Sequence, residues 1–97
     1  MTVQEYRDYI AAGNPVVAGS DAHLFMHQMA QEAIRITMEI NNKYHTPEEL
    51  RKLFSELWDI EVPESFGMFP PFNTDCGKNT HIGERVFINS GCKFQDQ

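Results

Sequence analysis

The stretch Cys76–Gln97 decides the fold, and it reads CGKNTH IGERVF INSGCK FQDQ when it is divided into groups of six residues. In these hexads the first residue is apolar, the second is Gly, Asn or Gln, and the fifth is small. The three columns are Cys76, Ile82, Ile88 and Phe94; Gly77, Gly83, Asn89 and Gln95; and Thr80, Val86 and Cys92. Self-similarity at a short fixed period predicts a repetitive coil rather than an ordinary sheet.

A left-handed parallel β-helix explains the period of six, because six residues cover one side and one corner of its triangular coil. The first and fifth residues of each hexad are then expected to point into the narrow interior. The second is expected at the corner, where a positive φ favours Gly or Asn. An ordinary β-hairpin with Ser90-Gly91 as its turn is the alternative, but three columns that match at once favour the coil.

The residues before the hexads predict helices. Apolar side chains recur at helical spacing from Val3 to Ala12, and again from Met26 to Ile40. Ser20 or Asp21 is a suitable N-cap for the second helix. The third helix has the clearest start, because Thr46-Pro47-Glu48-Glu49 combines a Thr N-cap, an early Pro and a Glu three residues after the cap.

Three prolines between residues 61 and 75 exclude a helix or a central strand there, and this segment is expected to be an extended connector. The sequence therefore predicts an α+β fold. Residues 1–60 form an N-terminal helical cap of about three helices, and residues 61–75 form the connector. Residues 76–97 form the first coil of a left-handed parallel β-helix, a coil that is expected to continue beyond Gln97.

Composition excludes several classes of function. The chain has 97 residues, with 8 Lys and Arg against 14 Asp and Glu, and a net charge of −6. An acidic chain is poorly suited to bind nucleic acid or an anionic membrane surface, because both require clustered cations. No apolar stretch is long enough to cross a bilayer, and no secretory leader is recognised, so a cytoplasmic location is expected. Two cysteines in a reducing compartment are expected to be free thiols.

The segment Pro70–Gly83, which reads PPFNTDCGKNTHIG, resembles the beginning of the hexapeptide-repeat domain of sugar O-acetyltransferases such as the maltose and galactoside acetyltransferases. Val86-Phe87-Ile88-Asn89 and Phe94-Gln95-Asp96 resemble the first coil of that family, and the helical part resembles its small N-terminal cap. The resemblance implies transfer of an acetyl group from acetyl-CoA, the co-substrate, to a sugar or another small hydroxyl acceptor. It also implies a homotrimer. No metal is expected, because no set of three ligands is evident in the sequence.

The resemblance implies residues on the acceptor side of the site. Asn89 matches an Asn that the family uses at the acceptor sugar, and Asp96 matches an Asp that follows the first coil. Asp75 matches a polar position just before that coil, and Asp21 is the nearest counterpart of an acid near the start of the second helix. The alternatives are that Asn89 fills a positive-φ corner and that Asp75 and Asp96 are solvated loop carboxylates.

No catalytic residue is assigned within the chain. The family's base is a His that lies one to two coils beyond Gln97, and its CoA-binding coils lie further on. The resemblance therefore predicts that these 97 residues are the N-terminal part of a longer enzyme and are inactive alone. A single coil also leaves an open face, so the isolated chain is expected to be unstable without oligomerisation or further coils.

The remaining candidate residues have structural interpretations. His23 and His27 have a spacing that can bind a metal, but no third ligand is evident, and a solvated helix face is expected instead. His45 is expected to be exposed. Cys76 and Cys92 are expected to be small buried side chains. The alternative function is a non-enzymatic interaction module that contributes helices and one coil to an assembly.

Overall fold

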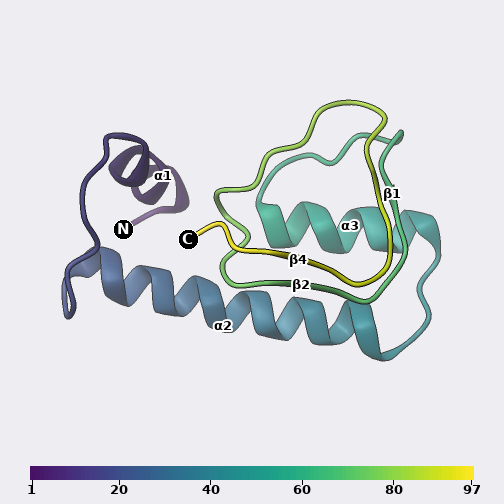
Figure 1. The fold of residues 1–97 in the computed structure, drawn as a ribbon, viewed down its shortest axis with the longest axis horizontal. Coiled ribbons are helices and arrows are strands. Elements are labelled where there is room, and N and C mark those ends of the chain that lie inside the picture. Colours follow the sequence, from purple (N-terminus) through teal and green to yellow (C-terminus); the bar gives the residue numbers. More distant parts are fainter.

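All residues from 1 to 97 are described in the computed structural model, which has an α+β fold of three helices and four short strands (Figure 1). The helices are α1 (Val3–Ala11), α2 (Asp21–Asn42) and α3 (Pro47–Trp58), and the strands are β1 (Gly67–Met68), β2 (Phe72–Thr74), β3 (Phe87–Ile88) and β4 (Cys92–Phe94). The strands lie beside α3 and the C-terminal half of α2, whereas α1 lies towards the other end of the molecule (Figure 1).

Side-chain caps explain where the helices begin. The Thr46 hydroxyl accepts a hydrogen bond from the Glu49 N–H at 3.2 Å, and the Glu49 carboxylate accepts one from the Thr46 N–H at 2.8 Å. This reciprocal pair confirms the capping box predicted for α3. Thr2 and Glu5 form the same arrangement at α1, and Ser20 caps α2.

The strands form two parallel two-stranded ladders. Gly67 of β1 lies opposite Phe87 of β3, and Phe72 of β2 lies opposite Cys92 of β4, so paired residues are 20 positions apart in both ladders. The hairpin alternative is wrong, because β3 and β4 pair with earlier strands and not with each other. The chain instead makes one course through β1 and β2 and a second course, through β3 and β4, alongside it.

The first course begins earlier than the sequence predicted. Strands β1 and β2 both lie within residues 61–75, the segment expected to be a connector. Pro71 tolerates this position because its carbonyl accepts a hydrogen bond from the Gly91 N–H at 2.9 Å, while its missing N–H is not needed by the ladder. The proline-rich segment therefore contributes strands as well as the connection.

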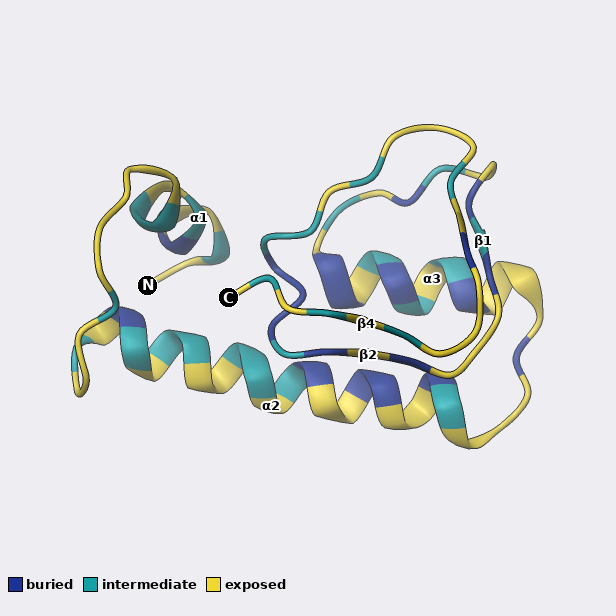
Figure 2. Cartoon of the chain, viewed as in Figure 1, coloured by how far each residue is buried: buried dark blue, intermediate teal, exposed yellow.

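Four aromatic side chains form the centre of the core. Phe54 and Trp58 extend from α3, and their ring centroids are 4.9 Å apart. The Phe54 ring also lies 5.4 Å from Phe66 and 5.1 Å from Phe72, in tilted or edge-on geometry that favours aromatic pairs. All four side chains are buried, and the buried faces of α2, α3 and the strands turn towards one another (Figure 2).

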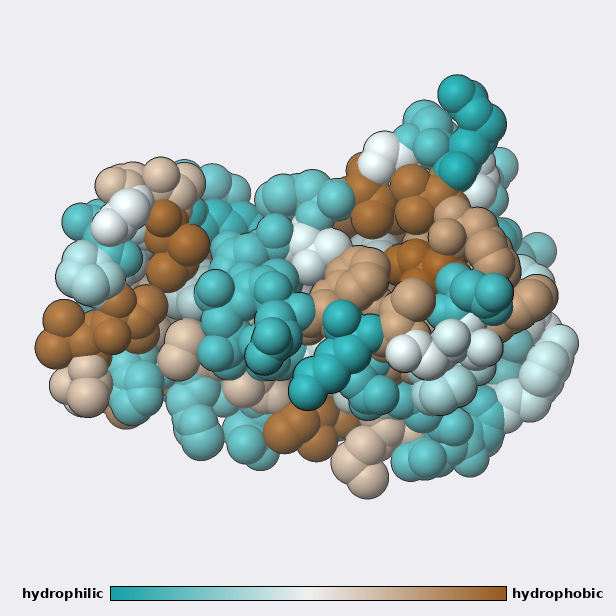
Figure 3. Space-filling view, viewed as in Figure 1, coloured by the Kyte–Doolittle hydropathy of each residue, from teal (hydrophilic) through white to brown (hydrophobic).

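The hexad columns agree with the burial pattern of the second course. Ile88 belongs to the core, and Ile82, Val86, Cys92 and Phe94 are half-buried and pack against it. These residues occupy the first and fifth positions of their hexads, which were expected to point inward. One face of this region nevertheless exposes apolar surface over the strands (Figure 3).

The prediction that the second residue of each hexad adopts a positive φ is confirmed for Gly77 only. Gly77 has a φ of 89°, and a Cβ at this residue would lie 2.8 Å from the Leu57 carbonyl oxygen, so both backbone and space require glycine. Gly83 and Asn89 do not have a positive φ, and the interpretation of Asn89 as a positive-φ corner residue is wrong. Arg85, with a φ of 56°, adopts that conformation instead.

None of the three helices is both long enough and apolar enough to cross a membrane.

Candidate functional site

Two of the four predicted acceptor-side residues lie together. The backbone N–H of Asp96, just after β4, donates a hydrogen bond to Asp75 Oδ1 at 3.0 Å, just after β2. Both residues are half-buried. The parallel ladder between β2 and β4 causes this proximity, because it places equivalent residues of the two courses side by side.

Most hydrogen-bond acceptor positions of the Asp96 carboxylate are occupied by donors within the protein. Its oxygens accept hydrogen bonds from the Gly77 N–H at 2.9 Å, the Asn79 N–H at 3.1 Å and the Thr80 hydroxyl at 2.8 Å. The Asn79 side-chain amide donates in turn to the Asp96 carbonyl oxygen at 2.7 Å. A carboxylate offers about four acceptor positions, so little capacity is left for a ligand. Asp96 therefore holds the turn at residues 77–80 in place.

Two protonated side chains lie beneath this turn. Tyr6 of α1 and Cys76 are both fully buried. Burial raises the pKa of the Tyr6 hydroxyl, and burial likewise raises the pKa of the Cys76 thiol, since each charged form would lose its hydration. A thiol that keeps its proton is a poor nucleophile, so Cys76 is a packing residue. The Tyr6 hydroxyl has no hydrogen-bond partner.

Lys78 is a buried cation that the sequence analysis did not select. Its Nζ donates to Glu32 Oε1 at 2.9 Å and to the carbonyl oxygens of Leu57 and Glu56 at 2.6 and 3.1 Å. A buried ammonium group requires such partners, because leaving water is otherwise very costly. The two carbonyls belong to the last turn of α3, where the helix dipole favours a positive charge.

Arg7 supplies a second cation at the same end of α3. Its Nε donates to the Lys78 carbonyl oxygen at 2.6 Å, and its Nη2 donates to the Trp58 carbonyl oxygen at 2.7 Å. The last carbonyls of a helix have no partners within the helix. Arg7 and Lys78 provide those partners, and they connect α1, α3 and the turn after β2.

The other two predicted residues lie apart from this cluster. Asn89 is exposed in the corner between β3 and β4, and its Oδ1 accepts a hydrogen bond only from the Ser90 N–H, at 2.8 Å. Asp21 is exposed in the first turn of α2. That corner and the start of α2 lie at opposite ends of the view in Figure 1. Within one chain, Asn89 and Asp21 therefore cannot contact the same small ligand.

The rings of His23 and His45 contact backbone groups of the protein. The prediction that His45 is exposed is wrong: it is 9% exposed, and its Nε2 lies 2.9 Å from the Glu39 carbonyl oxygen near the end of α2. The Nδ1 of His23 accepts a hydrogen bond from the Gly19 N–H at 3.0 Å, next to the Ser20 cap. No group of three His, Cys, Asp or Glu side chains lies close enough together to hold a metal ion.

Three of the four predicted residues have unused polar atoms: Asp75, Asn89 and Asp21, whose exposed carboxylate has no partner in the protein. Asp75 Oδ2 and the Asn89 amide nitrogen have no partner in the protein, so both can bind a hydroxyl. Comparisons with protein-family models, with curated proteins and with solved structures gave no match.

Proposed function

We propose that residues 1–97 form the helical cap and the first two courses of an acetyl-CoA-dependent sugar O-acetyltransferase of the hexapeptide-repeat family, with a left-handed parallel β-helix. One observation carries the proposal. In the stretch that resembles this family, β2 pairs in parallel with β4, and the hexad residues Ile88 and Phe94 turn towards the core; the paired residues are 20 positions apart, two more than the 18 of three hexads. Stacked parallel courses are the defining feature of a β-helix.

In this proposal the chain supplies the acceptor side of the reaction. The acceptor hydroxyl attacks the thioester carbonyl of acetyl-CoA, the carbon–sulfur bond breaks, and a base takes the hydroxyl proton. Asn89 orients the acceptor by donating a hydrogen bond from its free amide nitrogen. Asp75 Oδ2 accepts a hydrogen bond from a second hydroxyl of the acceptor. Asp96 positions Asp75 and the turn at 77–80. The base and the acetyl-CoA surface come from residues outside 1–97.

The subunit arrangement follows from the same resemblance. Asn89 and Asp21 are too far apart to act on one small acceptor within one chain. A homotrimer with sites between subunits would allow Asp21 of one chain to approach Asn89 of a neighbour. Light scattering on the product of the complete reading frame tests this arrangement, and a monomer at micromolar concentration contradicts it.

The activity is tested on the product of the complete reading frame. Release of the CoA thiol from acetyl-CoA is followed with a panel of mono- and disaccharides, and a reaction without sugar measures background hydrolysis. Replacement of Asn89 by Ala is expected to lower kcat/KM by at least about tenfold, equivalent to the loss of about 1.4 kcal/mol of transition-state binding. The exposed Asn42→Ala variant serves as the control.

Absence of sugar-dependent thiol release with every acceptor contradicts the proposal. A product that also lacks turnover but forms a stable complex with another protein favours the interaction module instead.

A further inference from the structure

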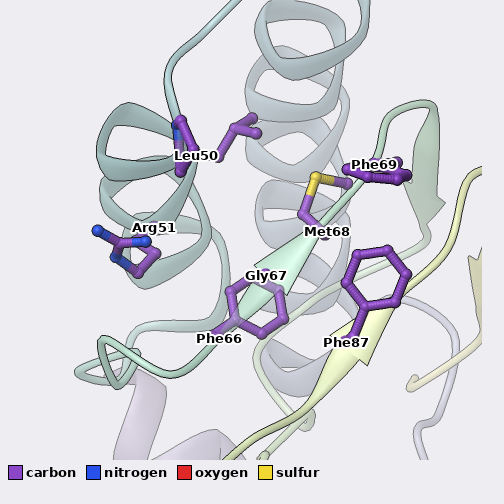
Figure 4. A pocket seen from close by; sticks show the side chains of 8 residues that line it. Leu50, Arg51, Phe66, Gly67, Met68, Phe69 and Phe87 are labelled. Carbon is purple, nitrogen blue, oxygen red and sulfur yellow. The ribbon is translucent and has the colours of Figure 1, made fainter.

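The corner between β3 and β4, residues 89–91, is short and is held at both ends. Before the corner, the Phe87 ring of β3 lies edge-on against the Phe69 ring, with centroids 5.0 Å apart (Figure 4). At its far end, the Gly91 N–H donates a hydrogen bond to the Pro71 carbonyl oxygen at 2.9 Å. All three corner residues are exposed. The corner is therefore fixed in position while its outer atoms meet water.

The Asn89 side chain turns back onto the backbone nitrogen that follows it. Its Oδ1 accepts a hydrogen bond from the Ser90 N–H at 2.8 Å, and this N–H has no other acceptor in the protein. Because a C=O bond is about 1.23 Å long, Asn89 Cγ lies within about 4 Å of the Ser90 nitrogen. Atoms about 3–3.5 Å apart are in position to react, so a small movement brings this pair together. The small side chain of Ser90 and the absence of one at Gly91 leave the approach open.

We propose that Asn89 is a site of spontaneous deamidation. The Ser90 nitrogen loses its proton to a base in the solvent and attacks Asn89 Cγ, so that a new C–N bond forms. The bond from Cγ to Nδ2 then breaks, and ammonia leaves with a proton taken from water. A five-membered succinimide ring remains. Water opens the ring at either of its two carbonyl groups and gives aspartate or isoaspartate at residue 89.

The other asparagines of the chain lack this arrangement. Asn14 precedes a proline, whose nitrogen carries no proton and cannot attack. The side-chain amides of Asn41 and Asn79 are bound to distant parts of the chain, and Asn73 lies within β2. Asn42 is exposed at the end of α2, but its side chain forms no hydrogen bond to the nitrogen of the next residue. Asn42 is therefore the matched comparison within the same molecule.

Deamidation changes both the charge and the shape of the corner. It adds one negative charge to a chain of net charge −6. Isoaspartate also adds one carbon atom to the backbone of a three-residue corner, so the pairing of β4 with β2 is expected to loosen. Both products lose Asn89 Nδ2, the donor assigned to the acceptor in the proposed acetyl transfer. The deamidation itself does not depend on that activity.

The test incubates the folded chain at mildly alkaline pH and follows each asparagine by peptide mapping with mass spectrometry. Asn89 is expected to convert at least about tenfold faster than Asn42, with isoaspartate among the products. The same incubation in urea is expected to reduce this ratio, because unfolding releases the Asn89 side chain from the Ser90 nitrogen. Ser90→Val places a β-branched side chain beside the attacking nitrogen, and it should slow conversion at Asn89 but not at Asn42. Circular dichroism checks that this variant is folded.

Three results overturn the proposal. Conversion of Asn89 no faster than that of Asn42 in the folded chain would show that the corner does not promote the attack. An equal ratio of the two rates in the folded and unfolded chains would show that only the identity of the next residue matters. Unchanged conversion in Ser90→Val would exclude the Ser90 nitrogen as the nucleophile. None of these results bears on acetyl transfer, because the measurement requires no turnover.

Discussion

The side chain of Asn41 pairs with the backbone of Phe72 as a neighbouring strand would. Asn41 Oδ1 accepts a hydrogen bond from the Phe72 N–H at 2.9 Å, and Asn41 Nδ2 donates to the Phe72 carbonyl oxygen at 2.8 Å. In a parallel ladder, alternate residues direct their N–H and C=O groups to opposite sides. The outward-facing N–H and C=O of Phe72 are therefore satisfied by α2, and a further strand cannot pair with this residue.

Loss of the Asn41 amide should destabilise the fold. Asn41→Ala would leave the N–H and C=O of the buried Phe72 without partners, which is expected to cost about 2 kcal/mol. Urea unfolding monitored by the fluorescence of Trp58 measures the change. Asn42→Ala, at the exposed last residue of α2, is the matched control and should change stability by less than about 0.5 kcal/mol. Equal effects of the two substitutions would contradict a role for the amide pair.

The buried Lys78 ammonium group should be required for stability. Lys78→Met keeps the length of the side chain but leaves Glu32 and two α3 carbonyls without their donor. Removing one partner of a fully buried charge pair typically costs about 3 kcal/mol or more, and because the Glu32 side chain is 32% exposed the expected loss is smaller, about 2 kcal/mol. Adding Glu32→Gln to Lys78→Met should recover part of the loss, and the double-mutant cycle measures the coupling between the two side chains. A coupling energy near zero would show that Lys78 acts only through the carbonyls.

Asp96 should be required for stability, because its carboxylate holds the turn at residues 77–80 in place. Asp96→Asn keeps the shape of the side chain but presents an NH₂ group towards N–H donors of the turn, so about 2 kcal/mol of stability is expected to be lost. Hydrogen exchange of the Gly77 and Asn79 amides should accelerate, because both donate to this carboxylate. Glu61→Gln, at an exposed residue without a hydrogen-bond partner, is the control. Unchanged stability in Asp96→Asn would contradict a role of the carboxylate in holding this turn.

The capping box of α3 predicts a pH dependence. Hydrogen bonds from Thr46 lower the pKa of Glu49 below its ordinary value of 4.5. A lowered folded-state pKa gives stability that is present above the unfolded-state pKa and is lost as the pH falls through the folded-state value. Glu49→Gln should therefore be less stable than the natural chain at about pH 6, and the difference should shrink towards about pH 3.

Glu48→Gln is the control for this titration, because it removes a charge from the same helical turn without breaking the reciprocal bonds. A difference for Glu49→Gln that does not change with pH would show that ionisation of Glu49 contributes nothing to folding.

Features encoded by neighbouring residues were predictable from the sequence. The start of α3 is determined by Thr46, Pro47 and Glu49, all within one turn, and the structure reproduces it. The inward positions of the hexads were also predictable, because a repeated side-chain pattern reports which face is buried. Strand pairing, in contrast, was not predictable from neighbouring residues. Strands β1 and β2 lie in a proline-rich segment, and they become strands only because β3 and β4 pair with them.

The cluster around Asp96 was predictable only in part. Asp75 and Asp96 were selected, but the sequence did not reveal that the Asp96 carboxylate is used by the turn at 77–80. The role of Lys78 was hidden for the same reason, since its partners lie 21 to 46 residues away in the chain. His45 lies in the connection between α2 and α3, where the sequence predicts an exposed side chain. The connection instead turns back, so that the His45 ring lies against the Glu39 carbonyl oxygen.

The contacts of Arg7 have a consequence for the order of folding. Its bond to the Lys78 carbonyl oxygen joins residues 71 positions apart, and its bond to Trp58 joins residues 51 positions apart. Closing such long loops costs chain entropy before any contact compensates for it, and contacts between distant residues form slowly. Docking of α1 is therefore expected to be a late kinetic step, after α2, α3 and the parallel strands have assembled. Substitutions at Arg7 should then accelerate unfolding while leaving the folding rate nearly unchanged.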